Sequence, residues 1–399
     1  MGFLNGDIKQ FVAKNLAVCT LSLSDFRSYD KIKIEVPETS VVITGHNGAG
    51  KTNILEALSF LVPGRGMKKA KLSEICRQTS RGLTEKPIPP WAISAQVKTP
   101  KGMIDIATGL DPQDLAQGRE RRIVKINKVQ ISNQSELGKT LSIVWLTPDM
   151  SSLFIQGASQ RRRFIDRLVA SSDPAHSGRI RAYEKATRER LHLLASKDRT
   201  PDAVWLSVLE NTIAEKGCAI AVTRLNFVDD LTTISKLNEG LFPASTLEMV
   251  GELEDWIRLD SALIVEDRLK ETLEKTRAAD SSIGKTQVGP HLSDLKVIQL
   301  EKNLPAEFCS TGEQKELLIS LILSHGKLCS TSHGQPSLFL LDEVTAHLDK
   351  KKRLALFETL DKIGCQAWLT GTDPSLFEGM LGRATFLKLD NGKVQTEPH

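Results

Sequence analysis

The sequence predicts an α/β fold in which a mixed β-sheet carries a phosphate-binding loop and a helical arm is inserted into the chain of that sheet domain. A glycine-rich loop with a lysine follows a β-branched run near residue 45, and an apolar run near residue 340 ends in two carboxylates. Between them lies a long stretch with helical spacing. We therefore expect residues 1–157 and 281–399 to form the two parts of one head domain and residues 158–280 to form the arm.

The loop at residues 45–52 fits the pattern G-x-x-x-x-G-K-[ST]. The β-branched residues before it favour a strand, and the apolar residues after it recur at helical spacing. Glycines allow backbone N–H groups to converge on a phosphate, a lysine can reach the terminal phosphates, and a threonine can bind Mg²⁺. This pattern predicts an ATP and Mg²⁺ site, although a glycine-rich turn between a strand and a helix can also carry Lys-Thr without a ligand. The predicted nucleotide-binding residues are Gly45, His46, Asn47, Gly48, Ala49, Gly50, Lys51 and Thr52.

The apolar run Leu338–Leu341 ends in the adjacent carboxylates Asp342 and Glu343. A strand buried on both faces has this composition, and the carboxyl edge of an open parallel sheet is where ligands bind. We expect Asp342 to belong to the Mg²⁺ shell together with Thr52, and Glu343 to accept a proton from the attacking water. Asp349, after the following turn, is expected near a dimer face. An apolar run that ends in Asp-Glu is also common in strands without such a role.

The stretch C-S-T-G-E-Q-K at 309–315 begins a third candidate region. Ser310 followed three residues later by Glu313 is a capping box, and the apolar residues after it predict a buried helix. The start of such a helix, with little side chain in the way, is also an anion site. A composite ATP site needs two anion sites when two protomers pair head to tail, so the region is expected to act on a partner's nucleotide. Its residues are Ser310, Thr311, Gly312, Glu313 and Gln314.

The lysine loop, the S-T-G-E-Q-K stretch and the L-L-D-E strand together resemble the ABC-type ATPases, and within them the chromosome-maintenance and repair branch. Five segments in their order resemble the landmarks of the bacterial RecF recombination mediators, and the resemblance covers nearly the whole chain. These segments are residues 21–36, 45–66, 160–168, 288–295 and 310–318.

The resemblance implies an ATP-dependent DNA-binding protein of recombinational DNA repair, replication-gap rescue and the SOS response. It implies slow ATP hydrolysis, an ATP-dependent homodimer on gapped or junction DNA, and cooperation with RecO and RecR in loading RecA. Three positions depart from the family pattern. Leu292 replaces an arginine after G-P-H, Thr311 replaces the first glycine of the wider signature, and no histidine follows the strand at 368, so Thr370 or Thr372 would sense the γ-phosphate.

Positive charge is concentrated locally, although the formal net charge is only +4. Residues 161–199 hold 11 Lys or Arg against 5 Asp or Glu, and shorter basic runs lie at 65–71 and 119–128. Each run could be a solvated face, but in an ATPase of this lineage they are expected to contact DNA phosphates. The predicted DNA-binding residues are Arg65, Lys68, Lys69, Arg161, Arg162 and Arg163.

Composition limits the remaining function classes. The six cysteines are far apart without a C-x-x-C pair, which argues against a zinc site and fits a reducing compartment. The sequence contains no stretch of 18 apolar residues, so we expect no membrane span. The expected location is the cytoplasm. Two alternatives remain open at this stage: the soluble ATPase subunit of a transporter, and a scaffold that binds ATP to dimerise and rarely hydrolyses it.

Overall fold

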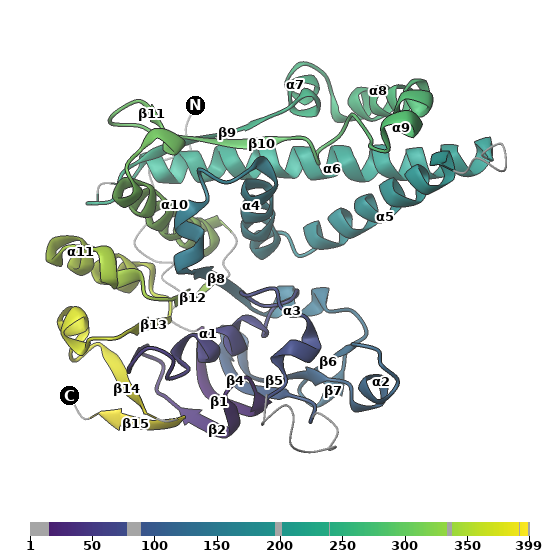
Figure 1. Ribbon diagram of the computed structural model, residues 1–399. Helices are drawn as coiled ribbons and strands as arrows, with labels where there is room; N and C mark the ends of the chain where they lie inside the picture. The colour runs from purple at the N-terminus through teal and green to yellow at the C-terminus, as the bar shows by residue number, and fades with distance from the viewer. Residues whose placement is uncertain are drawn as a thin grey trace. The chain divides into compact units, whose positions relative to one another are not determined.

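The computed structural model describes residues 16–77, 89–195, 202–238, 240–332, 337–390 and 392–397. Contacts group these residues into two compact units (Figure 1). Unit 1 comprises the described residues within 1–150, 240–242 and 322–399, and unit 2 those within 151–239 and 243–321. Residues 281–321 are thus grouped with the residues of the predicted arm, whereas the sequence assigns them to the head. The head and arm boundaries themselves stay predictions.

Unit 1 contains a six-stranded sheet in the order β15-β14-β3-β13-β12-β8. Its strands are β3 (Ser40–Thr44), β8 (Ser142–Leu146), β12 (Ser337–Leu341), β13 (Ala367–Gly371), β14 (Ala384–Asp390) and β15 (Lys393–Glu397). All neighbours run parallel except β14 and β15. Every residue of β3, β8, β12 and β13 is buried. The apolar runs before the loop and before Asp342 are therefore interior parallel strands, as the sequence predicts.

A second, antiparallel sheet of unit 1 has the order β2-β1-β4-β5-β6-β7. Its strands are β1 (Ala17–Phe26), β2 (Tyr29–Glu35), β4 (Ala92–Thr99), β5 (Gly102–Leu110), β6 (Arg122–Ile126) and β7 (Val129–Gln130). Helix α1 (Lys51–Ser59) buries its apolar residues in one core together with residues of both sheets. The remaining elements are α2 (Pro112–Ala116), α3 (Ser135–Thr140), α11 (Lys350–Ile363) and the short 3-10 turns η1 (Leu72–Ile75), η2 (Pro148–Ser152), η4 (Val344–His347) and η5 (Pro374–Met380).

Unit 2 is mainly helical, and Figure 1 shows helices α5 and α6 side by side. Its helices are α4 (Ala158–Ser172), α5 (His176–Ala195), α6 (Ala203–Lys236), α7 (Glu252–Leu259), α8 (Ala262–Lys275) and α9 (Arg277–Ile283). Strands β9 (Ser245–Val250), β10 (Asp294–Gln299) and β11 (Leu304–Pro305) form a small antiparallel sheet, followed by η3 (Ala306–Phe308) and by helix α10 (Thr311–Ser332), which continues into unit 1. Helices α4–α9 agree with the helical arm predicted between the two motifs, but strand β9 interrupts it.

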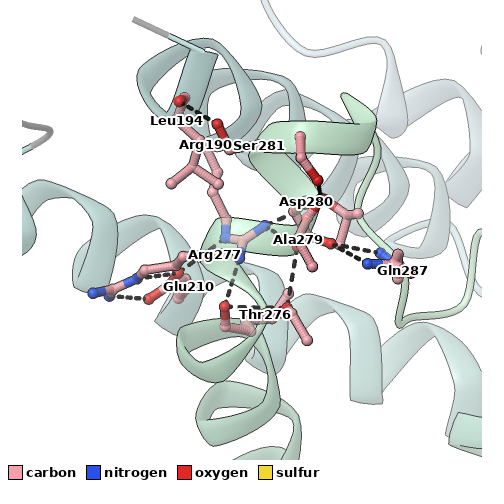
Figure 2. A network of polar contacts seen from close by, with 12 residues as sticks. Arg190, Leu194, Glu210, Thr276, Arg277, Ala279, Asp280, Ser281 and Gln287 are labelled. Carbon is pink, nitrogen blue, oxygen red and sulfur yellow. Dashed lines mark hydrogen bonds and ion pairs between the residues drawn. The ribbon is translucent and has the colours of Figure 1, made fainter. Parts of the chain in front are cut away.

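A buried ionic network joins three of these helices (Figure 2). Arg190 on α5 is fully buried and donates to Glu210 on α6 over 2.9 Å and to Asp280 on α9 over 2.7 Å. Arg277 donates to the same Glu210 carboxylate over 2.9 Å, and Gln287 N–H donates to Asp280. Each charge in the network has a partner of opposite sign within it, so the network cross-links the helices at a cost in desolvation that its own hydrogen bonds offset.

None of the described helices is both long enough and apolar enough to cross a membrane.

Candidate functional site

The loop from Gly45 to Gly50 links β3 to the first residue of α1 and needs glycine at specific positions. Gly45, Gly48 and Gly50 have φ values of 152°, 82° and 104°. A Cβ on Gly45 would lie 2.4 Å from the carbonyl oxygen of Leu389, and a Cβ on Gly50 would lie 2.5 Å from the Tyr29 hydroxyl. Among the described residues no side chain caps α1; the Asn53 N–H donates to the Gly50 carbonyl oxygen over 2.9 Å, and the Lys51 and Thr52 N–H groups are left for another acceptor. The local geometry is that of a phosphate cradle.

Lys51 is the first residue of α1 and is 4% exposed. Its ammonium donates to the carbonyl oxygens of Gly45 over 2.7 Å and His46 over 3.0 Å. Burial lowers the pKa of Lys51, and the nearby carboxylates of Glu343 and Asp342 act in the opposite direction. Among the described residues, only neutral carbonyl oxygens contact this cation directly.

The structure brings Asp342 to Thr52, although the two are far apart in sequence. Asp342 directly follows β12, is 5% exposed, and accepts hydrogen bonds from the Thr52 hydroxyl at 3.0 Å on each carboxylate oxygen. A hydroxyl facing a carboxylate at the phosphate loop is a fitting pair of donors for Mg²⁺, which is held in such sites by few protein oxygens alongside water and phosphate. The sequence pattern anticipates both residues but not the distance between them.

Glu343 begins the turn after Asp342 with a φ of 50°, a left-handed conformation uncommon for a residue with a side chain. Its backbone N–H donates to the Thr370 hydroxyl over 3.0 Å, and that hydroxyl donates to Asp342 over 2.7 Å. Thr370 is fully buried at the end of β13, whereas Thr372 is exposed. Of the two threonines considered from the sequence, the structure thus places Thr370 in the carboxylate cluster.

Tyr29 and Ser28 contact the end of the loop and the start of α1, and neither was predicted from the sequence to belong to the site. The buried Tyr29 hydroxyl donates to the Gly50 carbonyl oxygen over 3.0 Å, and Asn53 donates to the Ser28 hydroxyl over 3.1 Å. Ser28 lies in the turn between β1 and β2, Tyr29 is the first residue of β2, and both belong to the landmark segment at residues 21–36. The sequence signal that could have indicated this contact is the tyrosine next to a tight turn in that segment. These contacts hold Gly50, at the end of the loop, and the first turn of α1 in place.

Residues Ser310–Gln314, the signature region, lie at the start of α10 in unit 2. Ser310, Thr311 and Gly312 are exposed, and a Cβ on Gly312 would meet nothing within 4 Å. Ser310 N–H donates to Glu313 over 2.8 Å and Glu313 N–H donates to the Ser310 hydroxyl over 3.4 Å, so the predicted capping box is confirmed. Hydrogen bonds from Lys302 and then from Ser310 lower the pKa of Glu313 to about 2.

Two further residues of the predicted site have structural contacts of their own. Gln314 is buried and donates to the Cys309 carbonyl oxygen over 3.0 Å. Asp349 is exposed and caps α11, where it accepts from Lys352 N–H over 2.8 Å. Leu292, at the position where the family pattern has arginine, is 55% exposed.

The three consecutive arginines of α4, Arg161–Arg163, differ sharply in their surroundings. Arg161 forms a bidentate pair with Asp294 at 2.7 Å on each side, and this pairing raises the pKa of Arg161. Arg162 is half-buried and donates to the Ser293 carbonyl oxygen over 2.6 Å. Arg163 is exposed and makes no ion pair with any described residue. The first two arginines join one landmark segment to another, so only Arg163 has its guanidinium directed to solvent.

The other basic runs also divide into exposed and structural residues. Arg65, Lys68 and Lys69 are exposed in unit 1, and Lys68 lies 3.7 Å from Glu56. In contrast, the inclusion of Arg122 in a surface run is wrong. Arg122 is buried, donates to the carbonyl oxygens of Val62 and Gly64 and to Thr108, and its pKa is lowered by burial to about 10. Lys197 and Arg199, part of the 161–199 run, lie outside the described residues.

The chain is similar in sequence to a known protein family and to several of its members. Residues 17–393 match the family described as the RecF/RecN/SMC N terminal domain. The chain is 41% identical over 379 residues to the DNA replication and repair protein RecF of Mesorhizobium japonicum, covering 94% of this chain and 97% of that protein. It is 40% identical over 382 residues to the RecF of Brucella abortus, covering 95% and 96%.

A solved structure described as the recombination mediator protein RecF-ATP in the RecFOR pathway is similar to this chain with a TM-score of 0.80 and 23% identity. The similarity covers 97% of this chain and 99% of that one. The predicted fold class, an α/β head with a phosphate loop and an inserted helical region, is confirmed by this likeness and by the sheet described above.

Proposed function

The chain belongs to the RecF family of DNA replication and repair proteins, and from this premise we propose that it binds DNA in an ATP-dependent manner during recombinational repair. The proposed substrate is gapped or junction DNA, at which the protein helps RecO and RecR load RecA. The proposed location is the cytoplasm. Family membership disfavours the transporter-subunit alternative.

The nucleotide is proposed to be ATP, bound with Mg²⁺ by the loop of unit 1. The single observation that carries this proposal is the convergence of Lys51, Thr52 and Asp342 around one loop end, with Lys51 held only by neutral oxygens. An anionic phosphate would supply the negative charge that Lys51 lacks. Thr52 and Asp342 would hold Mg²⁺, which when bound offsets negative charge on the phosphates. His46, Asn47, Gly48 and Ala49 would line the cradle with their backbone.

Hydrolysis is proposed to be slow and to depend on Glu343. Its carboxylate follows the metal-binding aspartate on the same turn, which is the position expected for a group that accepts a proton from the attacking water. Among the described residues the Glu343 side chain forms no hydrogen bond or ion pair, so its oxygens are available for water.

ATP is further proposed to drive a head-to-tail homodimer. The exposed N-terminus of α10, with Ser310, Thr311 and Gly312, would contact the terminal phosphate held by the partner protomer. Glu313 and Gln314 would keep this helix start in shape, since the first completes the capping box and the second fastens the preceding segment. Asp349 would lie near the same interface.

DNA is proposed to contact the exposed cations Arg65, Lys68, Lys69 and Arg163 through its phosphates. Arg161 and Arg162 would contribute only indirectly because their guanidinium groups are engaged by Asp294 and Ser293. This division refines the six candidates predicted from the sequence.

The proposal is tested by measuring ATP binding, and ATP turnover with and without gapped DNA, for the wild type and for Lys51→Met. We expect slow turnover that DNA stimulates, and loss of ATP-dependent pairing in Lys51→Met because the γ-phosphate loses its cationic contact. Equal ATP affinity in the variant would contradict the phosphate-loop assignment. ATP binding and pairing without measurable turnover would instead favour the scaffold alternative.

A further inference from the structure

We propose that Thr370 is a positioning residue, which holds the Asp342 carboxylate and the backbone of Glu343 in their working orientation and does not sense the γ-phosphate. The inference rests on the proposed function, since it assigns a task within the same ATP and Mg²⁺ site.

The sheet topology brings Thr370 to this place. Strand β13 lies between β3, which leads into the phosphate loop, and β12, which leads into Asp342. Leu369 is in register with Val42 on one side and with Leu341 on the other, so Thr370 is the next residue toward the carboxyl edge of both neighbours. Among the described strands of this sheet, β13 alone borders both the loop strand and the carboxylate strand.

The hydrogen bonds of Thr370 account for its hydroxyl proton. A threonine hydroxyl has one proton to donate. Thr370 donates it to Asp342 over 2.7 Å and accepts from the Glu343 N–H over 3.0 Å. A hydroxyl that already gives its proton to a carboxylate has none for a phosphate oxygen, so the geometry assigns Thr370 to the carboxylates.

Both partners of Thr370 need to be held. Glu343 has a φ of 50°, a conformation that residues with a side chain rarely adopt. The hydrogen bond from its N–H to the Thr370 hydroxyl stabilises the turn in that conformation. Asp342 also accepts from Thr52, but Thr52 would turn its oxygen toward Mg²⁺ in the loaded site. Thr370 would then be the donor that still orients Asp342.

Packing leaves Thr370 little freedom to take another role. It is fully buried, and a Cβ on the next residue, Gly371, would lie 2.5 Å from the Phe377 ring. The strand therefore cannot move outward at this point without displacing Phe377. Thr372 lies just beyond and is exposed, with no hydrogen bond to any described residue. It provides a matched control because it is the same residue type at the same edge of the sheet.

The experiment compares the full-length wild type with Thr370→Val, Thr370→Ser and Thr372→Val. Two quantities are measured: the Mg²⁺ concentration that gives half-maximal binding of a fluorescent ATP analogue, and the rate of single-turnover ATP hydrolysis. Loss of a partner that orients a metal ligand typically reduces metal affinity or activity by about 10–100-fold. We expect a change of this size in both quantities for Thr370→Val, near wild-type values for Thr370→Ser, and an unchanged Mg²⁺ requirement for Thr372→Val.

The inference is overturned if Thr370→Val keeps the wild-type Mg²⁺ requirement and hydrolysis rate, or if Thr370→Ser is impaired as severely as Thr370→Val. If Thr370→Val does not fold, Thr370→Cys replaces it, and the weak thiol donor is expected to show the same defects; wild-type behaviour of that variant overturns the inference. A wild type that binds no ATP, or binds it without regard to Mg²⁺, contradicts the proposed function itself.

Discussion

Two clusters of charge in this molecule look alike in composition but are built differently. In the arm network, Arg190 is fully buried and is paired with Glu210 and Asp280. At the phosphate loop, Lys51 is almost as buried, but the only described groups that its ammonium contacts are carbonyl oxygens. A buried cation without a direct counterion is costly, and an anionic ligand would remove that cost. This difference supports the proposal that the loop binds an anionic ligand, whereas each charge of the arm network already has a partner of opposite sign.

The same distinction separates neighbouring residues of α4. Arg161 is paired with Asp294, whereas Arg163, two residues further along the same helix, is exposed. The charge of a segment therefore says little about binding until the partner of each charge is known. Each of the following predictions tests one side of this contrast.

The largest effect is expected from Glu343→Gln, which keeps size and hydrogen bonding but removes the base. We expect ATP turnover to fall by a factor on the order of 10² to 10⁴ while ATP still binds, and the dimer to remain on DNA. Steady-state turnover and a DNA retention assay check this. Turnover close to that of the wild type would show that another group activates the water.

The arm network is tested by Arg190→Met, which keeps much of the volume but leaves the two carboxylates without this partner. Removing one member of a buried ion pair costs about 3–5 kcal/mol in the free energy of unfolding. Hydrogen exchange in α5 and α6 should report the loss locally, and ATP affinity should not change. Lys185→Met on the exposed face of α5 is the control, with a change within about 0.5 kcal/mol. Equal stability of the two variants would show that the network is not a cross-link.

The smallest effects separate Arg161 from Arg163. For Arg161→Ala we expect a loss of about 1–3 kcal/mol in the free energy of unfolding, because a partly buried carboxylate loses its charged partner. For Arg163→Ala we expect unchanged stability, weaker DNA binding, and a reduction of about one in the slope of log affinity against log salt. Denaturant titration and DNA binding at several salt concentrations measure both. The reverse pattern would contradict the division between structural and exposed arginines.

The sequence predicts the parts of the fold whose signals are local. The strand before Gly45, the strand before Asp342 and the capping box at Ser310 each depend on residues within one short segment, and all three are present. Strand β9 (Ser245–Val250) was not predicted, because it lies within the stretch whose spacing was interpreted as helical, although Pro243 stands two residues before it.

Features that depend on distant partners could not be predicted. Arg122 looks like a surface cation, but its acceptors are carbonyl oxygens of Val62 and Gly64 on a segment far away in sequence. The choice between Thr370 and Thr372 likewise depends on where β13 ends relative to β12. In both cases the residue type is visible in the sequence, whereas its partner is known only from the fold.

The central claim is that ATP held by the phosphate loop joins two protomers through the start of α10, and Ser310→Arg tests it most directly. The measurement is the molecular mass in solution with ATP, at a concentration where the wild type dimerises, with Ser310→Ala as the control for losing the helix cap, which alone costs about 1 kcal/mol. An arginine at this exposed position would fill the space for the partner's γ-phosphate and repel the partner's Lys51. We predict that Ser310→Arg binds ATP but stays monomeric and is not retained on DNA. A folded, ATP-bound Ser310→Arg that dimerises like the wild type would contradict the head-to-tail arrangement and leave the signature as a helix cap alone.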